Sequence, residues 1–393
     1  MDMARRNVLV LSICQALSVG GMVVVFTAAA LAGQILADDD ALSTVPLALQ
    51  LTANMVMAIP ASLLMARIGR RAGFTLGQIF GVLGGLLGVY TLLYAKSFGL
   101  LCVSGILLGC HNAFWQYFRF AAVDTADKDF RSRAISYVLA GGVVAALIGP
   151  EIATRTVDLF GPVLYAGVYL SFTVLCCISI VVLQFLRIPK PSTGWNISGG
   201  RPLAEIIRQP TFIVAVLSAM VGYALMVLVM TATPLSMVAC GFAFPDAAFV
   251  IQWHAVAMFT PSFFTGHLIR KFGITAIIMA GCVLFLVCMA VNLAGIDIMN
   301  FWFGLVLVGV GWNFTFIGGT TLLTDAYRPE EKAKVQAIND FLVFGLSAIA
   351  SFASGALQNM YGWQAVNLAV IVPALIVFMG ALWLRRQRHA VVA

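Results

Sequence analysis

Charged residues are scarce in this chain of 393 residues: only 10% are Asp, Glu, Lys or Arg, whereas 61% are apolar. A soluble domain carries roughly 25% charged residues. The composition therefore excludes a soluble globule. It predicts a membrane protein, because a charged side chain is costly inside a bilayer.

Motifs for metal, nucleotide or hydrolytic chemistry are also lacking. The eight cysteines include no C-x-x-C pair and no Cys/His cluster, so we interpret them as apolar packing residues and expect no metal and no cofactor. The chain has no G-x-x-x-x-G-K-[ST] loop, no H-E-x-x-H and no G-x-S-x-G. These absences count against an ATP-driven pump and against a membrane enzyme.

Long apolar runs are abundant instead, and each is close to the roughly 20 residues that a helix needs to cross a bilayer. We predict an all-α membrane protein of twelve transmembrane helices around a central cavity. The Pro- and Gly-containing stretch 187–210 reads as a cytoplasmic linker between the halves 1–186 and 211–393. The expected helices are 8–36, 44–66, 74–95, 99–123, 134–154, 162–186, 211–236, 246–269, 274–295, 299–324, 335–357 and 363–384.

Basic residues alternate between the gaps. Of 23 Lys and Arg residues, 20 fall in every second gap. Cytoplasmic loops are rich in Lys and Arg, so this pattern predicts that both termini are cytoplasmic. The dispersed positive charge does not indicate a nucleic-acid partner. The 20 residues are Arg5, Arg6, Arg67, Arg70, Arg71, Lys128, Arg131, Arg133, Arg187, Lys190, Arg201, Arg208, Arg270, Lys271, Arg328, Lys332, Lys334, Arg385, Arg386 and Arg388.

The two halves resemble each other at a constant offset of 201 residues. Asn112 and Asp124 align with Asn313 and Asp325, and two basic residues follow in each half. Repeated halves with a substrate site between them are common in secondary transporters.

The loop Arg67-Ile68-Gly69-Arg70-Arg71, together with six plus six helices, resembles the major facilitator superfamily over the whole chain. Ser62 and Ala66 replace the Gly and Asp of that family's loop, and residues 266–273 form a degraded second copy. The resemblance implies that this loop helps to close the cytoplasmic side. The gating residues that it implies are Arg67 paired with Asp124, Lys271 paired with Asp325, and Arg70. The alternative is that these charges only set orientation.

Polar residues inside the apolar runs are the candidates for substrate contact. The fourth helix is the richest, and its polar groups recur at helical spacing on one face. Interhelical hydrogen bonds are the alternative role, and Arg119 could instead extend to the cytoplasm. The substrate-binding candidates are Gln15, His111, Asn112, Trp115, Gln116, Arg119, Trp253, Trp312 and Asn313.

Few acids lie at depth. Asp340, Glu151 and His254 are the main candidates for proton coupling, with His111 as a further one. Because the sequence has no central acid, facilitated transport without a proton stays open.

The most plausible function is secondary active or facilitative transport of a small organic solute by alternating access. The chain also resembles a bacterial branch of the superfamily that includes riboflavin importers, in stretches such as 233–237 and 318–324. Aromatic and amide side chains would suit such a heterocyclic vitamin. A proton-coupled multidrug efflux antiporter is the alternative, with Gly149-Pro150 as weak support. A transporter-like membrane receptor is the alternative from another class. We expect a monomer in the bacterial inner membrane, with the lipid bilayer and a small molecule as its partners.

Overall fold

The computed structural model describes residues 3–122, 124, 131–188 and 200–392, and these residues are almost entirely helical. The α-helices are α1 Met3–Leu36, α2 Val45–Ile68, α3 Arg70–Tyr90, α4 Phe98–Trp115, α5 Phe118–Ala121, α6 Arg131–Thr156, α7 Ala166–Leu183, α8 Leu203–Ile207, α9 Pro210–Ala239, α10 Phe244–Phe259, α11 Ser262–Phe272, α12 Ile274–Ala294, α13 Ile298–Leu323, α14 Lys332–Leu368 and α15 Ile371–Val392. Three short elements complete the set: the 3-10 helices η1 Asp40–Leu42 and η3 Pro329–Glu331, and the π-helical η2 Thr91–Ala95.

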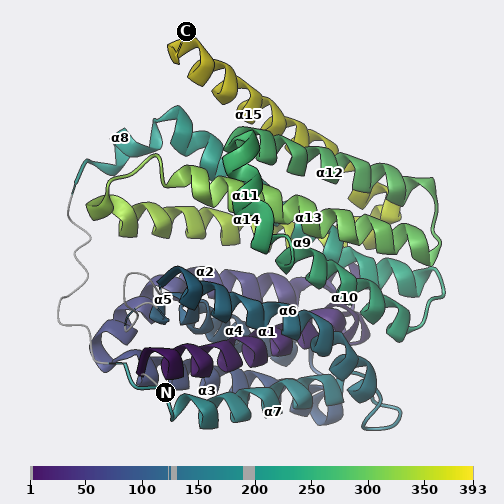
Figure 1. Cartoon of the computed structure of the whole chain (residues 1–393). Coiled ribbons are helices and arrows are strands. Elements are labelled where there is room, and N and C mark those ends of the chain that lie inside the picture. Colours follow the sequence, from purple (N-terminus) through teal and green to yellow (C-terminus); the bar gives the residue numbers. More distant parts are fainter. Residues whose placement is uncertain (1–2, 123, 125–130, 189–199, 393) are drawn as a thin grey trace.

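The two halves repeat one pattern of helix packing. In the first half, α1 packs on α6 and α7, α3 packs on α4 and α7, and α2 packs on α4. In the second half, α9 packs on α14 and α15, α12 packs on α13 and α15, and α10 packs on α13. Figure 1 shows the two bundles one above the other. The expectation of an all-α fold with two pseudo-symmetric halves is therefore confirmed.

Glycine permits the same close approach in each half. A Cβ at Gly109 of α4 would lie 2.1 Å from the carbonyl oxygen of Gln50 in α2. A Cβ at Gly309 of α13 would lie 2.7 Å from the carbonyl oxygen of His254 in α10. Small residues let membrane helices pack backbone to backbone, so these contacts fix α2 on α4 and α10 on α13.

Three helices that we predicted as continuous are interrupted. One of them, 363–384, is interrupted between Leu368, where α14 ends, and Ile371, where α15 begins. The predicted helix 99–123 ends as α4 at Trp115, and α5 resumes at Phe118. The predicted helix 246–269 bends by 46° between α10 and α11. Pro261 lies at this break, where its missing N–H removes a helical hydrogen bond. The predicted gap between 357 and 363 contains a kink at Gly362, whose φ of 79° and ψ of 180° are not helical, so α14 consists of two helical stretches that meet there.

Within the described residues, nine helices are long and apolar enough to cross a membrane, or ten if α10 and α11 form one span. This chain is thus a multi-pass membrane protein. The stretch Lys334–Arg388 counts once although it contains the break at Gly362, and α6 is not among the nine. The count of twelve crossings therefore stays a prediction.

The predicted linker 187–210 lies only partly within the described residues; its described end carries α8. Its boundaries stay predictions. Among the predicted orientation charges, Lys128 and Lys190 lie outside the described residues, as do the side chains of Arg131 and Arg133.

The halves meet along α2 with α14, α6 with α10, and α1 with α9. Interlocking polar contacts lie at the end that carries η1. Asn359 of α14 donates a hydrogen bond to the carbonyl oxygen of Asp40, and its Nδ2 lies 3.3 Å from Ser43 Oγ. Thr44 Oγ1 donates to the carbonyl oxygen of Phe352 at 3.5 Å. We call this region the η1 contact.

Candidate functional site

A cavity lies between the two halves, where helices of both contribute side chains. The space open to the centre of a water molecule is about 160 Å³. The first half contributes side chains of α1, α2, α4 and α5 to its wall. The second half contributes side chains of α9, α10, α13 and α14. The two walls differ in chemistry.

The wall from the first half is rich in amides. Gln116 Nε2 donates to Asn54 Oδ1 at 3.1 Å, which links α2 to the end of α4. Trp115 Nε1 donates to Asn112 Oδ1 at 3.1 Å. Gln15 of α1 completes this group. Each linked amide keeps a second polar atom for a ligand.

The wall from the second half is aromatic and thioether-rich. Trp312 and Phe316 of α13 stack with ring centroids 5.1 Å apart and an interplanar angle of 13°. The Tyr223 ring meets both of them edge-on, at 5.7 and 5.4 Å, and meets Phe344 at 5.6 Å. The methionines that line this wall are Met226, Met230 and Met258. Such a wall suits a large apolar ring, because thioethers and aromatic faces adapt to planar groups.

Arg119 and Asp340 bring opposite charges to the cavity from the two halves. They interact electrostatically but, within the described part of the chain, form no ion pair with each other. The Arg119 guanidinium lies 4.8 Å from the Phe120 ring centroid, and its buried Nε has no hydrogen-bond partner in the described structure. Asp340 Oδ1 accepts from Asn339 Nδ2 at 3.1 Å. An under-satisfied intramembrane charge of this kind is typical of a functional site.

Two further polar atoms at the cavity have no partner among the described residues. They are Nε1 of Trp312 and Nε2 of His254. The other ring nitrogen of His254, Nδ1, lies 2.8 Å from the carbonyl oxygen of Leu305. A backbone carbonyl can only accept, so Nδ1 carries the proton of the neutral ring and Nε2 is an acceptor.

Of the nine predicted substrate-binding residues, six line the cavity: Gln15, Asn112, Trp115, Gln116, Arg119 and Trp312. The other three lie elsewhere. His111 is buried, with Nδ1 3.1 Å from the carbonyl oxygen of Gly77. Asn313 donates to Met258 O and Ser262 Oγ, both at 2.7 Å. Trp253 is 39% exposed on the outer surface, beside Trp302. His111 and Asn313 thus join helices, and Trp253 faces outward.

The proton-coupling candidates also separate in space. Asp340 and His254 line the cavity. Glu151 is exposed and accepts a hydrogen bond from Arg155 at 2.7 Å. Among the described residues, no group of three His, Cys, Asp or Glu side chains could hold a metal ion.

The gating pairs differ from those that we expected. Asp124 pairs with Arg70 at 3.0 Å, whereas Arg67 is exposed. Arg67 lies in the last turn of α2, before the break at Gly69. Arg70 lies after that break, as the first residue of α3, and from there its side chain reaches Asp124. Asp325 pairs with Arg388 of α15 at 3.1 Å. Lys271, the expected partner, instead lies 5.2 Å from the Phe272 ring centroid. Neither pair joins the two halves: Arg70–Asp124 lies within the first half, and Arg388–Asp325 lies within the second.

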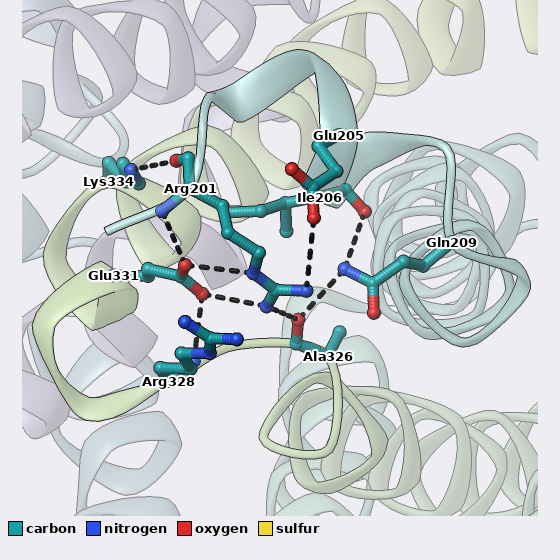
Figure 2. A network of polar contacts seen from close by, with 8 residues as sticks. All are labelled: Arg201, Glu205, Ile206, Gln209, Ala326, Arg328, Glu331 and Lys334. Atoms are coloured by element: carbon teal, nitrogen blue, oxygen red, sulfur yellow. Dashed lines mark hydrogen bonds and ion pairs between the residues drawn. The ribbon is translucent and has the colours of Figure 1, made fainter.

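An ionic cluster that the sequence did not predict, shown in Figure 2, fastens the described end of the predicted linker to the α13–α14 connection. Arg201 donates from Nε to Glu331 Oε1 at 2.9 Å and from Nη2 to Oε2 at 2.8 Å. The backbone N–H of Arg328 donates to Oε2 at 2.9 Å. The Arg201 hydrogen bonds hold the pKa of the Glu331 carboxyl well below its usual range. Gly200, at φ +80°, has no room for a Cβ, which would lie 2.4 Å from Glu331 Cγ.

Other cavity residues were also missed. Phe316, Phe344, Met226 and Met230 lie in apolar runs, where the sequence alone does not distinguish them from packing residues. The spacing of Met226 and Met230 by four residues placed them on one face of α9, and this was the only available signal.

The family model of the Major Facilitator Superfamily matches residues 9–351. The riboflavin transporter RfnT of Brucella anthropi is 41% identical over 369 residues, which cover 93% of this chain and 92% of that protein. The uncharacterized MFS-type transporter YddS of Bacillus subtilis is 28% identical, with 98% and 92% covered.

Two solved structures share the fold. A bacterial homologue of the lysosomal transporter Spinster has a TM-score of 0.70 at 17% identity, with 97% of each chain covered. A mutant of the nucleoside transporter NupG has a TM-score of 0.71 at 14% identity, with 96% of this chain and 99% of that chain covered. The family match and the RfnT identity confirm the expected resemblance to the riboflavin importer branch. The chain is therefore a transporter of the major facilitator superfamily and not an enzyme.

Proposed function

We propose that this transporter takes up riboflavin across the bacterial inner membrane. The observation that carries the proposal is the 41% identity to a riboflavin transporter over 93% of the chain. The cavity supports it, because one wall is aromatic and thioether-rich and the other presents amides and a guanidinium. Riboflavin combines a flat apolar ring system with a polar edge and a hydroxylated chain, so it needs both walls.

The proposed substrate contacts are the six predicted residues that line the cavity, with Asn54 and Tyr223 added. We leave His111 and Asn313 out as substrate ligands because their hydrogen bonds join neighbouring helices. Trp253 is left out because it faces away from the cavity. Arg119 is the central polar contact in this proposal, since its Nε is buried at the cavity without a partner among the described residues.

The proposed mechanism is alternating access, in which the halves rock about the cavity. The η1 contact joins the halves at one end. The pairs Arg70–Asp124 and Arg388–Asp325 hold helix ends within each half and so keep each half rigid during the motion. The substrate shifts the equilibrium between the two states only if it binds one of them more tightly than the other.

The proposed proton carrier, if uptake is coupled, is Asp340, with His254 as the second candidate. Both border the cavity, so a protonation change at either one alters the charge that the substrate meets. Glu151 is not retained, because it is exposed and already paired with Arg155. From the charge pattern we propose that both termini lie in the cytoplasm, and we propose that the protein acts as a monomer.

The deciding experiment is a flux assay with the purified protein in liposomes. Labelled riboflavin and a panel of dyes are supplied with and without a pH gradient. Saturable riboflavin entry supports the proposal, and acceleration by an inward proton gradient supports coupling. Absent riboflavin flux together with proton-driven movement of dyes would replace it by the multidrug antiporter.

A further inference from the structure

The hydrogen-bonded pair Asn54–Gln116 leaves one donor atom and one acceptor atom without a described partner at the cavity. Gln116 Nε2 donates to Asn54 Oδ1 at 3.1 Å. Gln116 Oε1 and Asn54 Nδ2 make no further hydrogen bond among the described residues. An amide nitrogen can donate twice and an amide oxygen accepts, so the pair offers N–H and C=O groups to a ligand.

This pair is held in place. Asn54 is 2% exposed, and Gln116 lies at the break between α4 and α5. Tyr117, the next residue, donates from its hydroxyl to the carbonyl oxygen of Ala58 at 3.0 Å, which ties this break to α2. The break thus turns Gln116 toward α2 instead of letting α4 continue straight. A fixed pair of this kind suits recognition better than two mobile side chains.

An imide is the ligand group that such a pair matches. In an imide, one N–H lies next to a C=O on each side. If an imide bound here, its N–H would donate to Gln116 Oε1 and a neighbouring C=O would accept from Asn54 Nδ2. Arg119, whose Nε is buried without a partner among the described residues, supplies donors for a further acceptor nearby on the same wall.

We propose that Asn54 and Gln116 read the imide edge of a planar heterocycle whose ring system packs among Trp312, Phe316 and Tyr223. This inference rests on the proposed function, since the pyrimidine ring of riboflavin carries such an edge at N3. It assigns the two amides a specificity role. A ligand that has the ring but lacks the imide N–H leaves the Gln116 oxygen unpaired, and an unpaired buried polar group is unfavourable.

The test compares riboflavin with N3-methylriboflavin, in which the imide N–H is replaced by a methyl group. Binding to the purified protein is measured by quenching of flavin fluorescence. We expect the wild-type protein to bind the methylated compound about tenfold more weakly. Because this arm uses only the wild-type protein, it does not depend on the folding of any variant.

Gln116→Ala removes the acceptor and makes room for the methyl group. This variant should bind the two compounds with nearly equal affinity. Gln387→Ala, at an exposed glutamine of α15, is the matched control and should keep the wild-type preference. Equal wild-type affinity for the two flavins would overturn the imide assignment while leaving riboflavin transport intact. So would an unchanged preference in Gln116→Ala. If neither flavin binds to the wild-type protein, the proposed function itself is overturned.

Discussion

Gly355 offers the sharpest test of the η1 contact. A Cβ added there would lie 2.5 Å from Thr44 Oγ1, 2.9 Å from Thr44 Cγ2 and 3.1 Å from Ser43 Oγ. Thr44 and Ser43 are fully buried, so neither side chain has free space to move into. Gly355→Ala should therefore wedge the two halves apart at this end.

The magnitude follows from the packing. Forcing an extra carbon into a well-packed contact costs about 1–3 kcal/mol. The strain acts only on the state in which the η1 contact is closed. The equilibrium should shift toward the other state by about 5-fold to 150-fold.

Spin labels at Asp38 and Met360 report this shift, because both residues are exposed and they flank the η1 contact from opposite halves. The native cysteines are first replaced. We expect the distance distribution of Gly355→Ala to move to longer values. Gly266→Ala is the control, because a Cβ at this helical glycine meets nothing within 4 Å. An unchanged distribution in Gly355→Ala, equal to that of the control, would refute the reasoning.

Three other predictions concern the cavity and the ionic cluster. Arg119→Ala should abolish riboflavin uptake in liposomes while membrane insertion stays normal, and undiminished uptake would remove Arg119 from the site. Trp312→Ala should weaken riboflavin binding by about 1–3 kcal/mol through loss of ring contact, whereas Trp253→Ala, on the outer surface, should leave the fluorescence titration unchanged. Glu331→Gln should lower the Tm in detergent at neutral pH, because the folded state lowers the pKa of Glu331. Because the carboxyl pKa is lower in the folded state than in the unfolded state, the ionised carboxylate stabilises the fold at pH values above the pKa of the unfolded state. This stabilisation decreases as the pH falls from that pKa toward the pKa of the folded state, so the Tm difference should shrink below about pH 5. A constant Tm difference from pH 7 to pH 4 would contradict this role for Glu331.

Much of the fold could be predicted because the bilayer imposes a length and a polarity on every crossing segment. The apolar runs located most helices, and the 201-residue offset indicated the two similar halves that the repeated packing of α1–α7 and α9–α15 confirms. The breaks at Gln116 and Pro261 were missed. A break after Gln116 depends on contacts with α2, such as that of Tyr117, which no local pattern reveals.

The candidate site was predictable only in part. Polar residues in apolar segments pointed to Arg119, Gln116 and Asn112, since burying such groups is costly and calls for a reason. The same rule does not distinguish a residue that lines the cavity from one whose hydrogen bonds join neighbouring helices. Asn313 satisfies its amide with Met258 and Ser262, whereas Asn112 lines the cavity, although the two residues occupy equivalent positions in the repeat.

The sequence by itself determined that this is a helical membrane protein built from two similar halves. Its apolar runs and the spacing of its charged residues depend on whether a segment lies in lipid or in water, and not on which side chains it later contacts. The tertiary structure decided which side chains meet. It paired Asp124 with Arg70 instead of Arg67, and Asp325 with Arg388 instead of Lys271. It also gathered the amides on one wall of the cavity and the aromatic rings on the other. Those choices depend on helix rotation and on breaks of a few residues, and hydrophobic periodicity is too coarse to fix either.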